Sequence, residues 1–157
     1  MAKSGVKIVL VEPEIPHNTG AIGRTCVALD IELILIKPYG FSLDTKTVQR
    51  AGTRYWQFVH LSEYASWQDF IDDRNPPRDQ LYLFEENGAQ SFYEPAYAQD
   101  AYLVFGKEST GIPDAVLDAL QDRTFHVPMR SPKVKSLNLS NVATAVVYQA
   151  MRHQLMS

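Results

Sequence analysis

The sequence has a single cysteine, which excludes a disulfide framework and a cysteine-based zinc site. Cys26 lies at helical spacing from Ile22 and Leu29, which indicates a buried thiol. The four histidines show no metal-ligand spacing, so we expect no metal site. No apolar run approaches the length of a membrane span and no signal-peptide pattern is present, so we expect a cytoplasmic protein without membrane contact.

Acidic residues are missing from residues 123–157. All 18 Asp and Glu lie in residues 1–122, against 10 Lys and Arg, which gives that part a formal charge of −8. The remaining segment carries +5 and predicts a basic face for an anionic partner. The net charge of −3 argues against a protein that coats nucleic acid generally, so such a face is local or built by two chains together.

Common nucleotide-binding and hydrolase signatures are also absent. No G-x-G-x-x-G follows a predicted strand, and neither G-x-x-x-x-G-K-[ST] nor G-x-S-x-G occurs. These absences disfavour a common dehydrogenase, a Rossmann-type methyltransferase, an ATPase and a serine hydrolase.

The 157 residues, 45% of them apolar, predict one globular domain over residues 1–157. Short apolar runs alternate with amphipathic stretches, which predicts an α/β fold with a mainly parallel sheet and flanking helices. We expect strands at 6–11, 32–36, 55–60, 81–84, 101–105 and 125–129, and helices at 19–30, around 44–51 with Gly52 as its C-cap, at 62–73, from 113, and at 138–155.

Three turn regions follow predicted strands, at 12–24, 105–113 and 128–138. In open α/β sheets ligands bind beyond the carboxyl ends of the strands, so these turns are candidates for one nucleotide-like site. Their glycines are equally consistent with tight turns alone. Ser136 and Asn138 either cap the last helix or hold a ligand at its start. Cations and aromatics suited to nucleic acid occur at Arg50, Arg54, Tyr55 and Trp56, where a helix end before a half-buried strand is the plainer interpretation.

Three stretches carry a resemblance to a known family. They read P-E-I-P-H-N-T-G-A-I-G-R-T-C (13–26), L-V-F-G-K-E-S-T-G-I-P (103–113) and V-P-M-R-S-P-K-V-K-S-L-N-L-S-N-V-A (127–143). In this order and at this separation they resemble the motifs of the SPOUT superfamily of RNA methyltransferases. The chain is most similar to its single-domain tRNA (cytidine/uridine wobble) 2′-O-methyltransferases, over nearly its whole length.

The resemblance implies a C-terminal deep trefoil knot, S-adenosylmethionine (SAM) as cofactor, tRNA as substrate and a homodimer with an active site shared between chains. The matching cofactor positions are Phe84, Gly106, Val127, Met129, Ser136 and Leu137. The matching catalytic positions are Asn18, Arg24, Glu108, Ser136 and Asn138. The candidates for RNA contacts are Arg50, Arg54, Arg130, Lys133, Lys135 and Tyr148.

Arg24 is a poor general base, because a guanidinium titrates far above neutral pH. We expect it to orient a phosphate and to stabilise developing negative charge. The chain departs from its relatives at Glu85-Glu86-Asn87-Gly88, where they usually carry a Thr/Lys-rich segment. The alternatives are methylation of another RNA position, a non-catalytic RNA-binding or assembly module of the same fold, and a flavin- or nucleotide-binding α/β protein.

Overall fold

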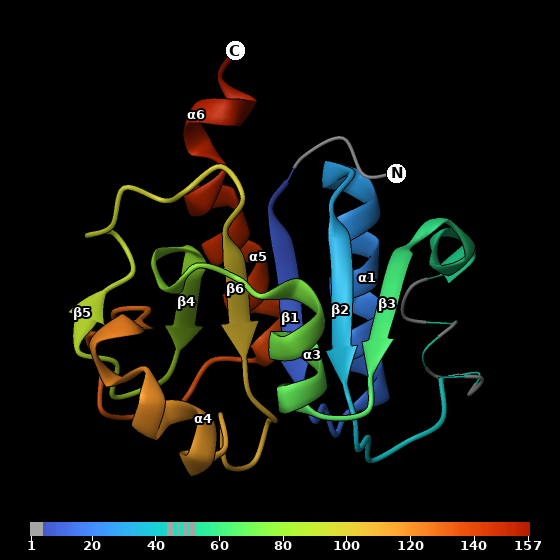
Figure 1. The fold of residues 1–157 in the computed structure, drawn as a ribbon, viewed down its shortest axis with the longest axis horizontal. Helices are drawn as coiled ribbons and strands as arrows, with labels where there is room; N and C mark the ends of the chain where they lie inside the picture. The colour runs from blue at the N-terminus through green and yellow to red at the C-terminus, as the bar shows by residue number, and fades with distance from the viewer. Residues whose placement is uncertain (1–4, 44–45, 47, 49, 51–52) are drawn as a thin grey trace.

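The computed structural model describes all residues except 1–4, 44–45, 47, 49 and 51–52. The fold is built on a seven-stranded sheet in the order β3-β2-β1-β6-β4-β7-β5, in which neighbouring strands are parallel (Figure 1). The predicted α/β class with a mainly parallel sheet is therefore confirmed. The strands are β1 (Lys7–Val11), β2 (Glu32–Ile36), β3 (His60–Tyr64), β4 (Leu81–Phe84), β5 (Gln90–Ser91), β6 (Tyr102–Phe105) and β7 (Thr124–His126).

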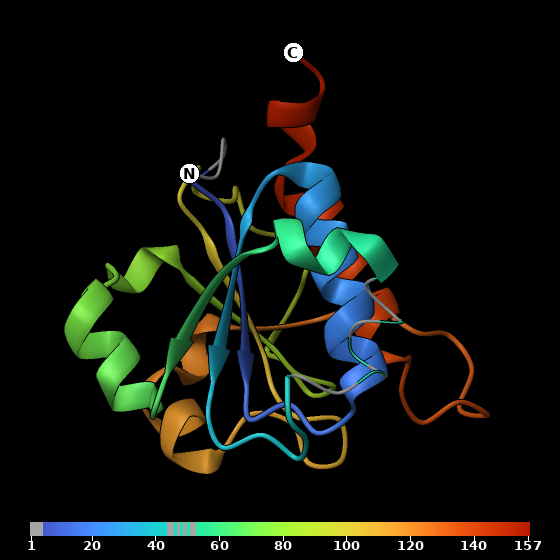
Figure 2. The same cartoon turned by 90° about the vertical axis from the view of Figure 1, so that its right-hand side faces the viewer.

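The central strands are apolar on both faces because helices cover both sides of the sheet. Side chains alternate along each strand, so Ile8 and Leu10 of β1 face one core while Val9 and Val11 face the other. Figure 2 shows α1 (Pro16–Leu29) and α5 (Leu139–Ala150) on one face, with α3 (Trp67–Arg74) and α4 (Asp114–Ala119) on the other. Cys26 is fully buried in the first core, as its spacing predicted, and burial raises the pKa of its thiol.

The strand predicted at 55–60 is wrong. Residues Thr53–Phe58 form the 3-10 helix η1, and the edge strand β3 begins only at His60. The aromatic run fits a strand by composition, but tertiary packing overrides that preference. The Trp56 ring lies so close to Gly23 of α1 that a Cβ at Gly23 would contact it at 2.6 Å. The run therefore packs on α1 and does not pair with β2.

Other boundaries shift for local reasons. The helix predicted at 62–73 begins at Trp67, where the Ser66 hydroxyl accepts a hydrogen bond from the Asp69 N–H (3.1 Å). Strand β7 stops at His126, and the last helix divides at Met151 into α5 and α6 (Arg152–Leu155). Parts of the helix predicted around 44–51, and its proposed cap Gly52, lie outside the described residues. Two further 3-10 helices, η2 (Arg78–Gln80) and η3 (Gln121–Arg123), flank β4 and β7.

The segment 127–138 connects β7, near one edge of the sheet, to α5, which lies with α1 on one face of the sheet. Helix α5 packs against α1 and β6, so the chain crosses from the β7 side of the sheet toward the middle. Figure 2 shows this segment running outward beside α1 before it returns to α5. It therefore passes the carboxyl ends of β4 and β6, where the turns that follow β1 and β6 also lie. None of the described helices is long and apolar enough to cross a membrane.

Candidate functional site

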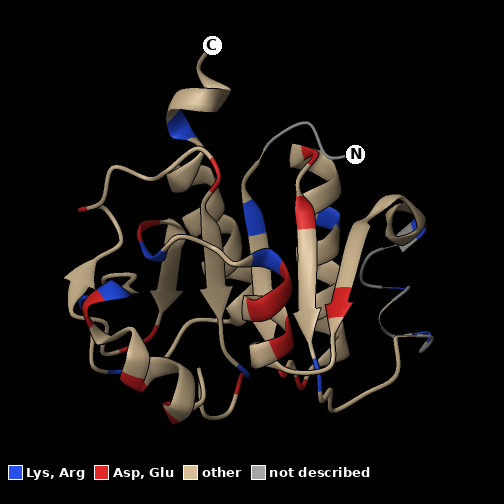
Figure 3. Cartoon of the chain, viewed as in Figure 1, with Lys and Arg blue, Asp and Glu red and all other residues tan. Residues whose placement is uncertain are grey.

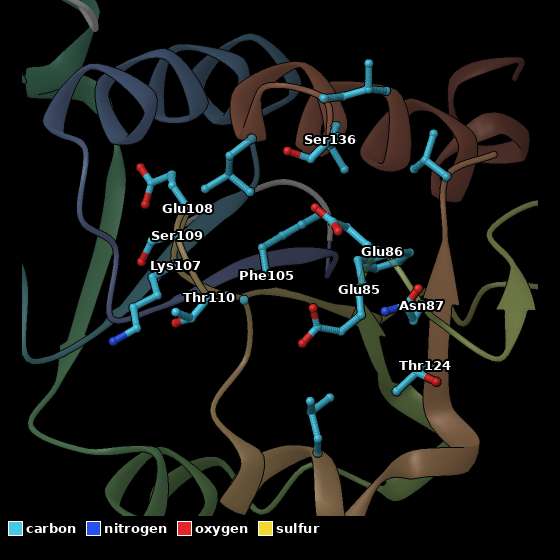
Figure 4. A pocket seen from close by; sticks show the side chains of 18 of the residues that line it. Glu85, Glu86, Asn87, Phe105, Lys107, Glu108, Ser109, Thr110, Thr124 and Ser136 are labelled. Atoms are coloured by element: carbon cyan, nitrogen blue, oxygen red, sulfur yellow. The ribbon is translucent and has the colours of Figure 1, made fainter. Parts of the chain in front are cut away.

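A cavity of about 950 Å³ opens at the carboxyl ends of β4, β6 and β7. Its walls come from the segments 84–89, 105–111 and 135–139, with further residues from the start of α1 and from α4. Figure 4 shows the polar side chains of these segments around one opening. The predicted convergence of three separate turns at one site is therefore confirmed, with Asn18, Gly106 and Ser136 all on its wall.

Glu108 connects the second turn to the first. Its Oε1 accepts a hydrogen bond from the Glu14 N–H (2.9 Å). Its Oε2 accepts from the Ile15 N–H (2.9 Å) and from Nδ2 of Asn18 (3.1 Å). Helix α1 has no capping side chain of its own and begins with Pro16, so the Glu108 carboxylate serves as its N-terminal cap. Both Glu108 oxygens therefore face the protein, which makes this residue a positioning group for the site.

Asn18 extends the connection to the third turn. Its side chain is 3% exposed, and its Oδ1 accepts a hydrogen bond from Nδ2 of Asn138 (3.1 Å). Oδ1 of Asn138 in turn accepts from the N–H (2.9 Å) and the hydroxyl (2.5 Å) of Ser140. The prediction of an N-cap at the start of the last helix is confirmed at Asn138. The chain Glu108–Asn18–Asn138 thus fixes the start of α5 relative to α1 and to the turn after β6.

A second contact, besides that of Glu108, holds the first turn and the second turn together. Oε1 of Glu14 accepts hydrogen bonds from the Ser109 N–H (2.9 Å) and hydroxyl (2.6 Å). These bonds hold the pKa of the Glu14 carboxyl below its usual value. Because Glu108 caps the Glu14 turn and Glu14 caps the Ser109 turn, each loop orders the other.

We expect Glu108→Gln to destabilise the protein by about 2 kcal/mol, because it replaces charge-assisted hydrogen bonds and faces an amide donor toward backbone N–H groups. The loss should be accompanied by weaker ligand binding at the cavity, since Asn18 and Asn138 lose their support. Thermal unfolding measures the first effect and calorimetric titration the second. Glu94→Gln, an exposed acid outside the cavity, is the matched control; equal behaviour of the two variants would contradict the assigned role.

The six residues predicted to border a cofactor all line the cavity. Phe84 stacks on Phe105 with ring centroids 5.0 Å apart and is 6% exposed, so it forms a rigid apolar floor. Met129 and Leu137 are 42% and 45% exposed, so their side chains are open to a ligand. The positions are Phe84, Gly106, Val127, Met129, Ser136 and Leu137.

The backbone of the third turn is free to bind a ligand. Among the described residues, the one hydrogen bond made by a backbone group between Val127 and Leu137 runs from the Lys133 N–H to the Ser131 hydroxyl (3.2 Å). Backbone N–H and C=O groups need partners when a ligand excludes water from them. Apolar floor and free backbone groups together suit a cofactor with a purine ring and a polar tail.

Arg24 is the one predicted catalytic residue that does not line the cavity. Its side chain is exposed on α1, and its Cζ lies 5.1 Å from the ring centroid of Tyr55. Arg54 approaches the same ring, with 5.5 Å from Cζ to the centroid. The hydrogen bond and charge of Arg54, together with the charge of Arg24, lower the pKa of Tyr55. Of the cations and aromatics noted in the sequence at Arg50, Arg54, Tyr55 and Trp56, the structure brings Arg54 and Tyr55 together, on a helical turn outside the cavity, whereas Trp56 packs against Gly23 of α1.

The remaining candidates for RNA contacts are exposed, at Arg50, Arg130, Lys133, Lys135 and Tyr148. Lys135 is the member of this group that also lines the cavity. Tyr148 is 49% exposed on α5. Within the described part of the chain, no three His, Cys, Asp or Glu side chains lie close enough together to hold a metal ion.

Several acids of the cavity wall have no role assigned from the sequence. Glu85 and Glu86 follow β4, and Asp114 and Asp118 come from α4. Burial raises the pKa of Glu85, the Ile112 N–H opposes this rise, and the charges of Glu86 and Asp114 add to it. The available signal was position, because Glu85 is the first residue after a buried strand.

The parallel sheet, the cavity at its carboxyl ends and the free backbone of the third turn define an α/β protein that binds a nucleotide-like ligand. The chain belongs to the SpoU rRNA methylase family, whose model matches residues 5–149. The resemblance to SPOUT methyltransferases drawn from the three motifs is thereby confirmed.

Individual relatives agree with this assignment over most of their length. The tRNA (cytidine(34)-2′-O)-methyltransferase of Polaromonas sp. is 40% identical over 92% of this chain and 88% of its own. The enzyme of the same name from Saccharophagus degradans is 40% identical over 92% of this chain and 93% of its own. A solved structure described as giving insight into the 2-OH methylation of C/U34 on tRNA is 37% identical, with a TM-score of 0.88 and 97% of both chains covered.

Proposed function

We propose that this protein transfers a methyl group from SAM to the ribose 2′-hydroxyl of nucleotide 34, a cytidine or uridine, in the anticodon loop of tRNA. The observation that carries the proposal is the near full-length likeness to enzymes named for this reaction, at 40% identity. The cavity supports it, because the three turns that match the family motifs meet there. An enzyme of this class accounts for intact polar residues at the site better than a non-catalytic module does.

SAM, when bound, supplies a methyl group already activated for transfer by its sulfonium. The chain's own part is to bind the cofactor on Phe84, Val127 and Leu137, and to offer the backbone of the third turn to its polar edges. The remaining work is positioning and the exclusion of water, which supply much of the rate in such transfers.

On the substrate side, Ser136 lines the cavity two residues before the α5 cap Asn138, and in this proposal its hydroxyl holds the ribose 2′-oxygen. Asn138 and Asn18 orient this end of the cavity through their mutual hydrogen bond. Glu108 acts behind them and does not touch the substrate in this proposal. Arg24 binds the adjacent phosphate and stabilises negative charge as the hydroxyl loses its proton.

The position of Arg24 supports a homodimer with a shared site. Arg24 does not line the cavity of its own chain and contacts Tyr55 instead, so its proposed contact with the substrate phosphate requires a cavity other than its own. A partner chain would supply its own Arg24 there. Two copies of the basic segment would also offset the acidic body for a polyanionic RNA, with contacts from Arg50, Arg54, Arg130, Lys133, Lys135 and Tyr148.

We also propose that residues 1–157 act as one domain and that its C-terminal part passes through a loop to make a deep trefoil knot. The crossing from β7 to α5, past the ends of β4 and β6, supports such threading. A cytoplasmic location follows from the proposed tRNA substrate.

The direct experiment maps ribose methylation in total RNA from cells with and without the protein. Loss of 2′-O-methylation at position 34 of particular tRNAs, restored by the wild-type chain, is the expected result. Loss of methylation at another RNA position would favour the alternative substrate. An unchanged methylation pattern, with RNA binding intact, would favour a non-catalytic module.

A further inference from the structure

Charge is unevenly distributed around the cavity. The side formed by β4 and α4 carries Glu85, Glu86, Asp114 and Asp118. Figure 3 shows acids on α4 next to the carboxyl ends of the strands. The cations of the wall are Lys107, on the turn after β6, and Lys135, on the basic segment 127–138 that leads into α5. An acidic wall repels RNA phosphates and favours a ligand group of positive charge.

Glu85 is the innermost of these acids. Figure 4 shows its side chain extending from the end of β4 toward the turn that carries Thr110. Its Oε1 accepts a hydrogen bond from the Ile112 N–H (2.9 Å). Its Oε2 lies against Gly111, where an added Cβ would approach it to 2.6 Å, and it has no hydrogen-bond partner among the described residues.

The surroundings of Glu85 disfavour its ionised form relative to a carboxylate in water. The side chain is half-buried, and the nearby Glu86 and Asp114 add repulsion, so its pKa is raised. The two cations of the cavity wall do not offset the repulsion at Glu85. Nζ of Lys107 lies 3.9 Å from Oε1 of Glu12, and Lys135 belongs to the exposed third turn. A positively charged ligand beside this carboxylate would therefore be stabilised by it and would favour its ionised form. The other charged groups of the wall are Glu86, Lys107, Glu108, Asp114, Asp118 and Lys135.

We propose that Glu85 is a specificity residue that makes the cofactor site prefer the positively charged methyl donor over its uncharged sulfide product. The inference rests on the proposed function, since it takes SAM as the cofactor. SAM and S-adenosylhomocysteine share their adenosine and amino-acid ends and differ by the methyl group and one positive charge on sulfur. A negative wall therefore weakens product binding relative to donor binding and favours exchange after each transfer.

The test is the ratio of the two affinities, measured by calorimetry on the full chain without RNA. Glu85→Gln keeps the shape and the acceptor for the Ile112 N–H but removes the charge. We expect SAM binding to weaken about fivefold to tenfold, and binding of S-adenosylhomocysteine to change less than about twofold. Glu94→Gln changes the net charge equally from outside the cavity and should leave the ratio unchanged.

A structural role would give a different pattern. Removing an unfavourable buried charge should leave the melting temperature of free Glu85→Gln unchanged or raise it, whereas a structural carboxylate would lower it. Equal weakening of both ligands, or an unaltered ratio, overturns the inference while leaving the proposed function intact. Failure of the wild-type chain to bind either ligand overturns both.

The wild-type chain provides a test that needs no variant. The raised pKa means that Glu85 is ionised above that pKa and neutral below it. The preference for SAM is therefore expected in full well above the raised carboxyl pKa and should fall as the pH is lowered through it. A constant affinity ratio over that range would count against Glu85 as the discriminating charge.

Discussion

Arg24→Ala is expected to slow methyl transfer by about 100-fold to 1000-fold while the dissociation constant for SAM changes less than about twofold. The guanidinium is exposed and contacts Tyr55, and it contributes nothing to the cavity wall where the cofactor is proposed to bind. Under the proposed function, its loss removes a bidentate phosphate contact and the charge that stabilises the forming alkoxide. Single-turnover transfer of labelled methyl groups to tRNA, with calorimetry for SAM, measures both quantities.

Arg54→Ala is the matched control for charge, because Arg54 approaches the same tyrosine ring. It should raise the KM for tRNA with little change in kcat. A mixture of Arg24→Ala and Ser136→Ala chains tests the shared site, since a mixed dimer would combine one intact cavity with one intact arginine. Partial recovery of activity is expected from the mixture. Equal loss of SAM affinity and rate in Arg24→Ala would show that Arg24 belongs to the cofactor site.

The apolar strands could be predicted because burial on both faces leaves a local mark in the sequence. The predicted runs at 32–36 and 81–84 coincide with β2 and β4, and the candidate turns follow three other apolar strands, β1, β6 and β7. The aromatic run at 55–60 was misassigned because its conformation depends on Trp56 packing against Gly23, a contact between distant parts of the chain. The proposed knot could be inferred only from the family resemblance, since nothing in periodicity indicates threading.

The site shows the same division between local and distant information. The cap at Asn138 was predictable, because it lies directly before an apolar helix. Glu108 was assigned a catalytic role, whereas the structure points both of its oxygens at the first turn. An acid in a glycine-flanked loop gives the same sequence signal whether its carboxylate meets a substrate or backbone N–H groups some 90 residues earlier in the chain. The hydrogen-bond partners of a residue so far away in the sequence can be identified only from the folded structure.

Gly106→Ala is expected to destabilise the protein by about 3 kcal/mol and to abolish measurable SAM binding. An added Cβ would overlap the carbonyl carbon of Gly111 and the amide nitrogen of Ile112. Both are backbone atoms, so no side-chain rotation relieves the overlap, and the end of β6 must separate from the turn that returns past it. Thermal unfolding should show a fall of about 10 °C for a chain of this size.

Displacing the turn after β6 is expected to disturb the whole site, because this turn carries Glu108, which connects it to the start of α1. Lys107 and Gly111 exchange backbone hydrogen bonds (3.2 and 2.8 Å), and this pairing places Glu108 under the start of α1. Gly5→Ala is an instructive control, since its Cβ would meet the end of the Asp100 side chain, which can rotate away. We expect that variant to lose less than about 1 kcal/mol. Normal SAM affinity in Gly106→Ala would mean that the close approach of these two backbone segments is not what shapes the cofactor site.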